Sequence, residues 1–270
     1  MKKIILDAGH GYNTPGKRTP SGVNGVVREW TMNANVCNYI AEILKDYDVE
    51  ITRVDDVTGQ TDVPVQTRTN KINSINPDLF ISIHHNGNTG NWGNWSYVCA
   101  FYNVNKQKRD ADLAAMLAAE ISKQTGIKNS GGLPDTKSAV GSLHMVRETK
   151  STIPSVLCEG GFMDSTIDYP IITSEKGQRA YAQAVANICV SYLGLTKTED
   201  TTQGTKTVKI TYDDIKITVD GKPTTLKNLE GQAIEPFLMD DTMYVPISPL
   251  VRQFGKTSTY DGKSKTLVIN

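Results

Sequence analysis

Two hydrophobic periods alternate over residues 1–195 of the chain. Short runs in which nearly every position is apolar predict strands buried on both faces, and longer stretches with apolar residues three and four positions apart predict helices. The predicted strands cover residues 4–8, 49–54, 78–86, 95–103, 142–147 and 155–162. The predicted helices cover residues 31–47, 63–75, 109–126 and 174–194. This alternation predicts an α/β domain with a central, mostly parallel or mixed sheet flanked by helices.

Residues with special backbone preferences mark the ends of several predicted helices. Pro64 lies near the first turn of its helix, where an N–H group would have no partner. Ser174 is the predicted N-cap of the last helix, and Gly126 and Gly194 are predicted C-caps. Long loops are predicted at residues 11–25, 86–95 and 129–141. Loops at the carboxyl ends of strands are where open sheets bind ligands, so such loops are candidate walls of a site.

The second of these loops carries two tryptophans, Trp92 and Trp95, among small and polar residues. Because their neighbours leave the rings little local core, the pair is a candidate contact for the face of a sugar. Packing of both rings across the base of the loop explains the same pattern equally well.

The pattern changes after residue 195. Residues 196–207 contain no aliphatic side chain and are rich in Thr, Lys and acidic residues, which predicts a linker. Residues 208–270 show the alternating apolar positions of short strands, so we predict a small β-rich module with one short helix at 247–254. Hairpin turns are predicted at two Asp-Gly pairs, Asp220-Gly221 and Asp261-Gly262.

Composition narrows the classes of function. The 270 residues contain 29 Lys+Arg and 29 Asp+Glu without blocks of like charge, which argues against a nucleic-acid partner. No stretch is long and apolar enough to insert into a membrane. The first residues begin like a signal peptide, but the apolar run is too short and Asp7 interrupts it, so none is predicted. The four cysteines are widely spaced, which predicts buried free thiols.

Histidine and glutamate side chains stand at the ends of predicted elements. His10, His84 and Glu159 lie at or near the carboxyl ends of three predicted strands, and Glu29 precedes the first predicted helix. The chain contains only four histidines, so two at strand ends are a notable fraction. Unpaired acids at the ends of buried strands are costly, and the joint pattern therefore predicts a functional site.

The chemistry of this set suits a metal-dependent hydrolase. Catalytic zinc takes three protein ligands and leaves one position open. Two imidazoles and one carboxylate form a known ligand set for amide hydrolysis, and a second carboxylate can accept a proton from water. His10 and His84 with Glu29 and Glu159 supply this inventory. No HExxH motif is present, which excludes a helical site of the thermolysin type.

Each member of the set also has a simpler explanation. A histidine at a strand end is often a hydrogen-bonded surface group. Glu29 can be an acid favoured by the positive end of a helix, and Glu159 can pair with Arg147. His84 and His85 are adjacent, so on a strand they point to opposite faces and only one of them joins the site. Spacing alone does not choose between them.

Several segments together resemble the zinc-dependent N-acetylmuramoyl-L-alanine amidases of the type-3 amidase family. They are DAGHG at 7–11, the glutamate of VVREW, the run 68–86 ending in SIHHN, the run 143–165 containing VLCEGGF, and the closing helix. The resemblance covers residues 1 to about 194 in the order of the family. It implies an α/β fold with a central mixed sheet, one zinc ion held by two histidines and a glutamate, and a further glutamate as catalytic base.

The resemblance assigns the residues one by one. His10 matches the ligand in DAGHG, Glu29 matches the glutamate that opens the first long helix, and His84 matches the ligand in SIHxN. His85 then occupies the variable position of that motif. Glu159 matches the catalytic glutamate of VLxExGF.

Two arginines and one cysteine complete the comparison with the family. Arg68 and Arg147 match recurrent family arginines, but the resemblance gives them no role. Cys158 replaces the usual aliphatic residue before the glutamate, which leaves the expected metal ligands unchanged.

The activity implied by the resemblance is hydrolysis of the amide bond between N-acetylmuramic acid and the L-alanine of the stem peptide in peptidoglycan. Without a predicted signal peptide, the enzyme is expected to act at the bacterial cell wall in one of two ways. It is a phage or prophage endolysin that stays cytoplasmic until released through a membrane pore, or an autolysin whose signal this chain lacks. A wall-binding protein with a degenerate site and a zinc peptidase are the alternatives.

Residues from about 206 onward resemble the small β-rich repeat named after the amino-terminal domain of copper amine oxidases. The name implies neither copper nor oxidase activity here, because the segment contains no histidine. Attachment to the cell wall is the role expected by association. The sequence predicts no oligomeric state.

Overall fold

A computed structural model divides the chain into two units, Met1–Glu199 and Asp200–Asn270. The residues that it describes are 1–21, 25–198, 210–211, 218–219, 222–223, 225, 233, 237–239, 242–244, 251, 255, 258–261 and 266–269. Among these residues, no helix combines the length and the apolar character needed to cross a membrane.

The first unit is built on a six-stranded sheet with the strand order β2-β1-β3-β6-β4-β5. The strands are β1 (Lys2–Ala8), β2 (Val49–Arg53), β3 (Leu79–Asn86), β4 (Val98–Tyr102), β5 (Asn129–Pro134) and β6 (Ser155–Phe162). Neighbouring strands are parallel except β4 and β6, which are antiparallel. The predicted mostly parallel, mixed sheet is confirmed, and β1, β3 and β6 end at the same edge.

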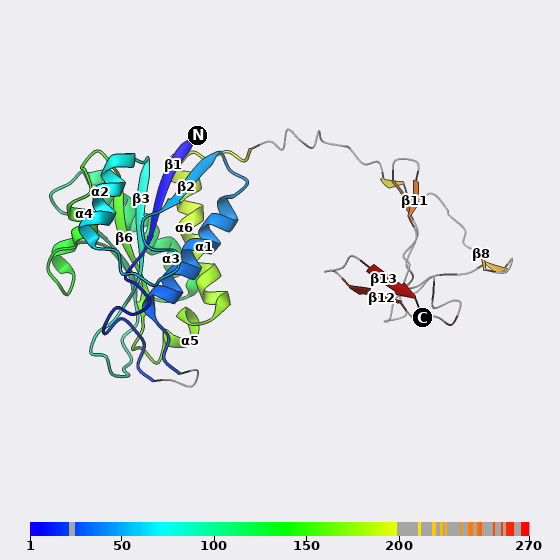
Figure 1. Cartoon of the computed structure of the whole chain (residues 1–270), viewed down its shortest axis with the longest axis horizontal. Helices are drawn as coiled ribbons and strands as arrows, with labels where there is room; N and C mark the ends of the chain where they lie inside the picture. The colour runs from blue at the N-terminus through cyan, green and yellow to red at the C-terminus, as the bar shows by residue number, and fades with distance from the viewer. Residues whose placement is uncertain are drawn as a thin grey trace. The chain divides into compact units, whose positions relative to one another are not determined.

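Helices cover both faces of the sheet, as predicted (Figure 1). One face packs against the long helices α1 (Glu29–Leu44), α3 (Lys108–Thr125) and α6 (Glu175–Leu193). Among the described residues, the helices on the other face are α2 (Val65–Ile75) and the single turn α4 (His144–Arg147). The short helices η1 (Asp135–Lys137) and α5 (Tyr169–Ile172) lie in connections. The second face is therefore covered by less helix than the first.

The predicted helix ends are confirmed where the structure describes them. The Ser174 side chain accepts a hydrogen bond from the Gly177 N–H and caps α6. Gly126 and Gly194 adopt the left-handed conformation at the ends of α3 and α6. All four cysteines are buried and free. Local sequence signals thus specify the carboxyl end of α3 and both ends of α6 correctly, whereas α1, predicted at 31–47, spans Glu29–Leu44.

The predicted strand at 142–147 is wrong, because residues 144–147 form α4. Met145 and Val146 are both buried although they are adjacent in sequence. Met145 packs with Ile5 and Phe80, and Val146 packs with another cluster that contains Leu157. A strand would send these two neighbours to opposite sides, whereas one helical turn buries both against the same face of the sheet.

The predicted loop at 129–141 is wrong over its first half, because residues 129–134 form β5 at the edge of the sheet. β5 pairs in parallel with β4 and packs against α3. A Cβ atom on Gly132 would lie 2.6 Å from the backbone nitrogen of Ala115, so the glycine permits a close approach of strand and helix. The sequence of β5 is polar and rich in glycine, so the pattern of apolar positions did not predict this strand.

The predicted linker at 196–207 begins too early. The Asp48 N–H donates to the Thr196 carbonyl at 2.9 Å, and the Thr198 N–H donates to the Asp46 carbonyl at 2.8 Å. Residues 196–198 therefore belong to the first unit, while 199–207 lie outside the described residues. The domain boundaries at 195 and 208 otherwise stay predictions.

The second unit is β-rich, as predicted. Its described strands are β7 (Ile210–Thr211), β8 (Thr218–Val219), β9 (Lys222–Pro223), β10 (Phe237–Met239), β11 (Thr242–Tyr244), β12 (Ser258–Asp261) and β13 (Thr266–Ile269). β8 pairs with β9 and β12 pairs with β13, both antiparallel, which confirms the two hairpins. The second predicted turn begins one residue too early, because Asp261 is the last residue of β12 and pairs with Thr266. Asp220, Gly221 and Gly262 of the turns lie outside the described residues, as does the helix predicted at 247–254 apart from residue 251.

Candidate metal centre

Three strands and one helix bring the four predicted site residues to one edge of the sheet. His10 follows β1, His84 lies in β3, Glu159 lies in β6, and Glu29 is the first residue of α1. β3 and β6 are parallel neighbours in which His84 and Glu159 are in register. All four side chains line one cleft. The strand order therefore brings together four residues that lie far apart in the sequence.

His10, Glu29 and His84 form a compact cluster. His10 Nε2 lies 3.5 Å from Glu29 Oε2, and His84 Nδ1 lies 3.1 Å from Glu29 Oε1. One donor atom from each residue falls within 4.8 Å of the other two. Ligand atoms around tetrahedral zinc lie about 2 Å from the ion and therefore about 3.3 Å from one another. The donor set and its spacing fit a zinc ion.

Glu29 is the member of the cluster that most requires a cation. Its side chain is 1% exposed, and Oε2 has no hydrogen-bond partner among the described residues. Burial raises the pKa of Glu29, but the attraction of His10 and His84 and then of Lys17 outweighs burial and lowers this pKa to about 2. A buried, ionised carboxylate oxygen without a hydrogen bond is costly, and a bound cation would remove that cost.

The two imidazoles of the cluster differ in their electrostatics. Burial lowers the pKa of His10 to about 4, so this imidazole is neutral at physiological pH. Burial also opposes the charge on His84, but the hydrogen bond to Glu29 raises the pKa of His84. Neutral imidazole is the form that binds a metal, so His10 is held in a form that can bind one.

The DAGHG segment shapes the turn that presents His10. A Cβ atom on Gly9 would lie 2.0 Å from the His84 ring, so only glycine fits beneath this imidazole. His10 itself has a φ of 69°, in the left-handed region that non-glycine residues rarely adopt. Such a conformation persists where the surrounding structure enforces it.

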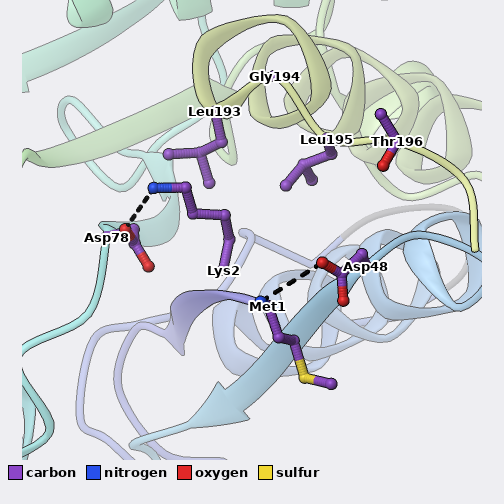
Figure 2. A pocket seen from close by; sticks show the side chains of 8 residues that line it. All are labelled: Met1, Lys2, Asp48, Asp78, Leu193, Gly194, Leu195 and Thr196. Carbon is purple, nitrogen blue, oxygen red and sulfur yellow. Dashed lines mark hydrogen bonds and ion pairs between the residues drawn. The ribbon is translucent and has the colours of Figure 1, made fainter.

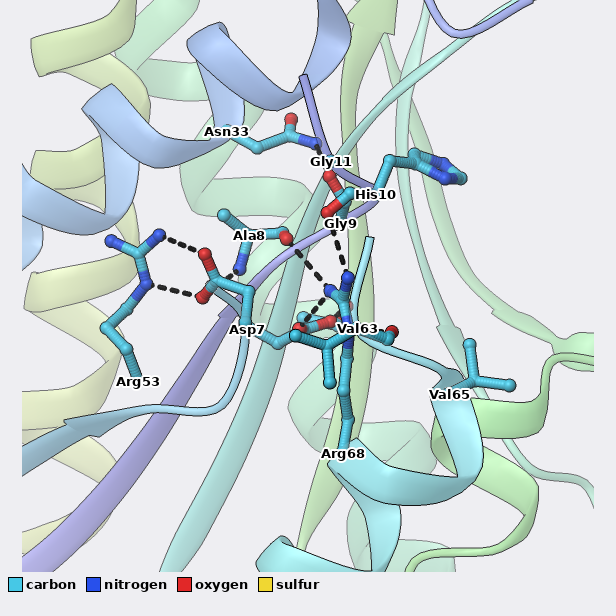
Figure 3. A network of polar contacts seen from close by, with 12 residues as sticks. Asp7, Ala8, Gly9, His10, Gly11, Asn33, Arg53, Val63, Val65 and Arg68 are labelled. Atoms are coloured by element: carbon cyan, nitrogen blue, oxygen red, sulfur yellow. Dashed lines mark hydrogen bonds and ion pairs between the residues drawn. The ribbon is translucent and has the colours of Figure 1, made fainter. Parts of the chain in front are cut away.

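Arg68 provides that enforcement (Figure 3). Its guanidinium is 2% exposed and donates to Asp7 Oδ1 at 2.7 Å and to Asp62 Oδ1 at 2.9 Å. It also donates to the carbonyl oxygens of Ala8 at 3.0 Å and His10 at 2.9 Å. Arg68, to which the family resemblance gives no role, thus fixes the backbone that carries His10.

We expect Arg68→Met to lower the free energy of unfolding by about 3–5 kcal/mol, because it leaves the buried Asp7 carboxylate without its cation. Urea denaturation of the metal-free protein measures this loss. Arg179→Met is the matched control, since Arg179 forms exposed ion pairs with Glu175 and Glu42 and lies over the Tyr39 ring at 4.0 Å, and its loss should cost about 1 kcal/mol. Equal losses for the two variants would contradict the structural role of Arg68.

Glu159 stands beside the cluster without joining it. Its Oε2 is buried and has no hydrogen-bond partner among the described residues. Burial raises the pKa of Glu159 to about 7, against the attraction of His84. A carboxyl group that titrates near neutrality can both accept and donate a proton. Arg147 pairs with Glu148 at 2.7 Å, so the alternative pairing of Glu159 with Arg147 is wrong.

His85 points away from the cluster, as strand alternation requires for one of the two adjacent histidines. Its Nδ1 lies 2.8 Å from Asn33 Oδ1, and its ring packs edge-on against Tyr181 at 5.6 Å. Asn33 Nδ2 donates to the Gly9 carbonyl at 3.2 Å and to Glu29 Oε1 at 3.5 Å. Asn33 therefore contacts three parts of the centre: His85, the turn at Gly9, and Glu29. The sequence alone did not predict this residue. Its place four residues after Glu29 on the same helix face is the signal that could have found it.

The cluster opens into a cleft of about 700 Å³. Trp95 lines this cleft, whereas Trp92 does not. Trp92 Nε1 donates instead to the Ser21 carbonyl at 3.0 Å, and the Trp92 ring packs edge-on against Tyr169. The structure thus separates the two tryptophans. A sugar contact stays a prediction for Trp95 only.

Asp164 organises the loop that carries Trp95. Its buried carboxylate accepts the N–H groups of Asn88, Thr89 and Gly90 at 2.8–3.1 Å. It also accepts the Trp95 indole N–H at 2.9 Å. The sequence did not reveal Asp164, because its partners are mostly backbone groups of a distant segment.

A second hollow, of about 370 Å³, lies near the amino end of β1 (Figure 2). Lys2 pairs there with Asp78 at 2.9 Å, and the amino group of Met1 pairs with Asp48 at 3.4 Å. These charges satisfy one another, and none of the predicted site residues lines this hollow.

The fold and the site together define a class of protein: an α/β domain with a His-Glu-His centre and a free buried carboxylate at the carboxyl edge of its sheet. Residues 4–189 match the family model described as N-acetylmuramoyl-L-alanine amidase, and the chain belongs to this family. Residues 179–269 match the model described as copper amine oxidase N-terminal domain. Both resemblances seen in the sequence are confirmed. The role of the second module in wall attachment stays a prediction, which co-sedimentation with cell walls can test.

Curated relatives come from bacteria and a phage. The amidase CwlM of Bacillus licheniformis is 28% identical over 200 residues, covering 73% of this chain and 71% of the relative. A sporulation-specific N-acetylmuramoyl-L-alanine amidase of Bacillus subtilis is 25% identical over 198 residues, covering 73% and 71%. The endolysin of Bacillus phage SPP1 is 27% identical over 203 residues, covering 73% and 68%.

Solved structures show the same fold. The catalytic domain of CwlV, an amidase from Bacillus (Paenibacillus) polymyxa, superposes with a TM-score of 0.61 at 23% identity, covering 73% of this chain and all of that domain. The amidase AmiC2 of Nostoc punctiforme superposes with a TM-score of 0.60 at 24% identity, covering 72% of this chain and 97% of that one. At these identities the likeness supports the fold alone.

Proposed function

We propose that this protein is a zinc-dependent N-acetylmuramoyl-L-alanine amidase that hydrolyses the bond between the lactyl group of N-acetylmuramic acid and the L-alanine of the stem peptide. The observation that carries the proposal is the cluster of His10, Glu29 and His84 with the free carboxyl group of Glu159 beside it. Family membership is the basis for peptidoglycan as the substrate.

The proposed roles follow from the contacts of each residue. His10, Glu29 and His84 would hold the zinc ion, through two imidazole nitrogens and one carboxylate oxygen. When bound, zinc supplies a Lewis acid that polarises the amide carbonyl and makes a water molecule more acidic. Glu159 accepts the proton of the attacking water and then delivers it to the leaving amine nitrogen. Arg68 and Asn33 keep the ligands in place.

A digest of purified peptidoglycan tests the reaction. We expect the protein to release glycan strands and peptides whose new amino termini are L-alanine, which mass spectrometry identifies. New termini at a later position of the stem peptide would show a peptidase instead. The proposal would be overturned if protein that contains about one zinc ion per chain left the cell wall undigested.

The site of action follows from the substrate, which is in the bacterial cell wall. The relatives include both a phage endolysin and a host sporulation amidase. An endolysin or an autolysin is therefore the proposed setting for the enzyme.

A further inference from the structure

The strand order gives the cleft a direction. The ligand His10 follows β1, the ligand His84 lies in β3, and Glu159 lies in the next strand, β6. Beyond β6 the sheet continues with β4 and then β5. The cleft is lined from the loop after β1, at Lys17, to the segment after β5, at Val140. The metal centre and Glu159 lie between these two ends of the cleft. We call the part towards the loop after β1 the arm on the β1 side, and the part towards β4 and β5 the arm on the β4 side.

The proposed reaction places a different part of the substrate in each arm, and this step rests on the proposed function. The general acid must reach the leaving nitrogen, so the amine of L-alanine lies on the side of Glu159. The carbonyl of the lactyl group lies on the side of the ligands. The stem peptide must then continue from Glu159 towards β4 and β5, and the sugar towards the loop after β1.

The arm on the β4 side has an apolar floor. In the antiparallel pair of β4 and β6, Cys99 lies opposite Glu159 and Phe101 lies opposite Leu157, so these side chains share one face. Phe101 and Leu157 pack with Tyr97 and Leu143, and all four line the cleft. This floor suits short alkyl side chains such as those of alanine residues.

One positively charged side chain lines this arm of the cleft. Lys137 lines the cleft and is exposed, and no ion pair among the described residues includes it. Its backbone belongs to η1, which the buried Asp135 holds in place. Asp135 Oδ2 accepts the Asn103 side-chain N–H at 3.0 Å, and its Oδ1 accepts the Val104 N–H at 3.3 Å. The ammonium group is thus carried by a fixed turn and is available for an anion.

We propose that the floor of Tyr97, Phe101, Leu143 and Leu157 is the binding site for the stem peptide, and that Lys137 recognises a free carboxylate of this peptide. The stem peptide offers such a group early, because the glutamate after L-alanine is linked through its side chain and leaves its α-carboxylate free. Lys137 is then a specificity-determining residue that distinguishes a carboxylate from its amide.

Cell walls that differ only in this group test the proposal. Walls with a free α-carboxylate on the glutamate and walls amidated at that position are digested in parallel, and new L-alanine amino termini are counted. We expect kcat/KM to be about two- to fivefold higher on the free acid, as a partly exposed ion pair provides. Lys137→Met should bring this ratio close to one, and Lys137→Arg should restore it.

Lys128→Met is the matched control, because Lys128 is exposed, precedes β5 at its other end, and does not line the cleft. Lys128→Met should show the same rate as the wild-type protein and the same ratio of kcat/KM between the two kinds of wall. Equal rates of the unchanged protein on both walls, or an undiminished ratio in Lys137→Met, would overturn the role of Lys137 while leaving the amidase intact. Failure to form L-alanine termini on either wall would instead overturn the proposed function, and with it this inference.

Discussion

Glu159→Gln is expected to bind zinc and fold normally while kcat falls by about two to four orders of magnitude, because glutamine cannot accept a proton. The substitution preserves the size of a side chain whose Oε2 makes no hydrogen bond among the described residues. Three measurements check the expectation: release of L-alanine termini, elemental analysis of zinc, and thermal unfolding. Glu148→Gln is the matched control, since Glu148 is exposed and pairs with Arg147. Near-full activity of Glu159→Gln would remove Glu159 from the reaction.

The same residue predicts the pH dependence of the reaction. Burial raises the pKa of Glu159 to about 7, and a bound cation nearby favours the carboxylate and lowers this pKa. The base is active only when ionised, so kcat/KM should rise with pH through a limb at or below about 7. In Glu159→Gln this limb should be absent from the residual activity. An unchanged limb in the variant would assign it to another group.

His84→Ala is expected to abolish activity and to weaken zinc binding by more than the 10- to 100-fold typical of residues that only orient a ligand. The variant removes one of three donors and leaves Glu29 Oε1 without the imidazole that lies 3.1 Å away. Competition with a chromophoric chelator measures the affinity for zinc. His144→Ala is the matched control, because His144 contacts Thr69 outside the cluster.

Zinc binding should also raise the free energy of unfolding. An ion present at about 1,000 times its dissociation constant adds about 4 kcal/mol to the free energy of unfolding. Chelation should remove this contribution from the unchanged protein and from His144→Ala, but should have little effect on His84→Ala. Equal zinc content and equal stabilisation of His84→Ala would exclude His84 as a ligand.

Much of the fold could be predicted because the signals are local. The long helices and the buried strands of the first unit follow from apolar spacing, and the caps Ser174 and Gly194 follow from backbone preferences. The failures have physical causes. β5 contains two glycines and polar residues, so no apolar period marks it. α4 is one turn long, too short for a helical period to be distinguished from a strand.

The candidate site could be predicted only in part. The residue types and their places at strand ends indicated metal-dependent hydrolysis, and the family motifs chose His84 over His85. Alternation required that one of the two histidines turn away, and the structure shows His85 in contact with Asn33. The supporting contacts of Arg68 and Asp164 remained hidden, because they join groups more than 50 positions apart or backbone atoms that no motif records.

The sequence by itself determined the α/β class, the two-part organisation, the chemistry of the four site residues and, through its motifs, the family. Only the tertiary structure decided which atoms meet. Oε2 of Glu29 is left without a hydrogen bond among the described residues, and Arg68 holds the strained turn of His10. The antiparallel pairing of β4 with β6 sets Phe101 opposite Leu157 and so forms the apolar floor next to Glu159. The physical reason is one of range. Periodicity and capping act within a few residues, whereas register and strand order are set by the packing of the whole domain.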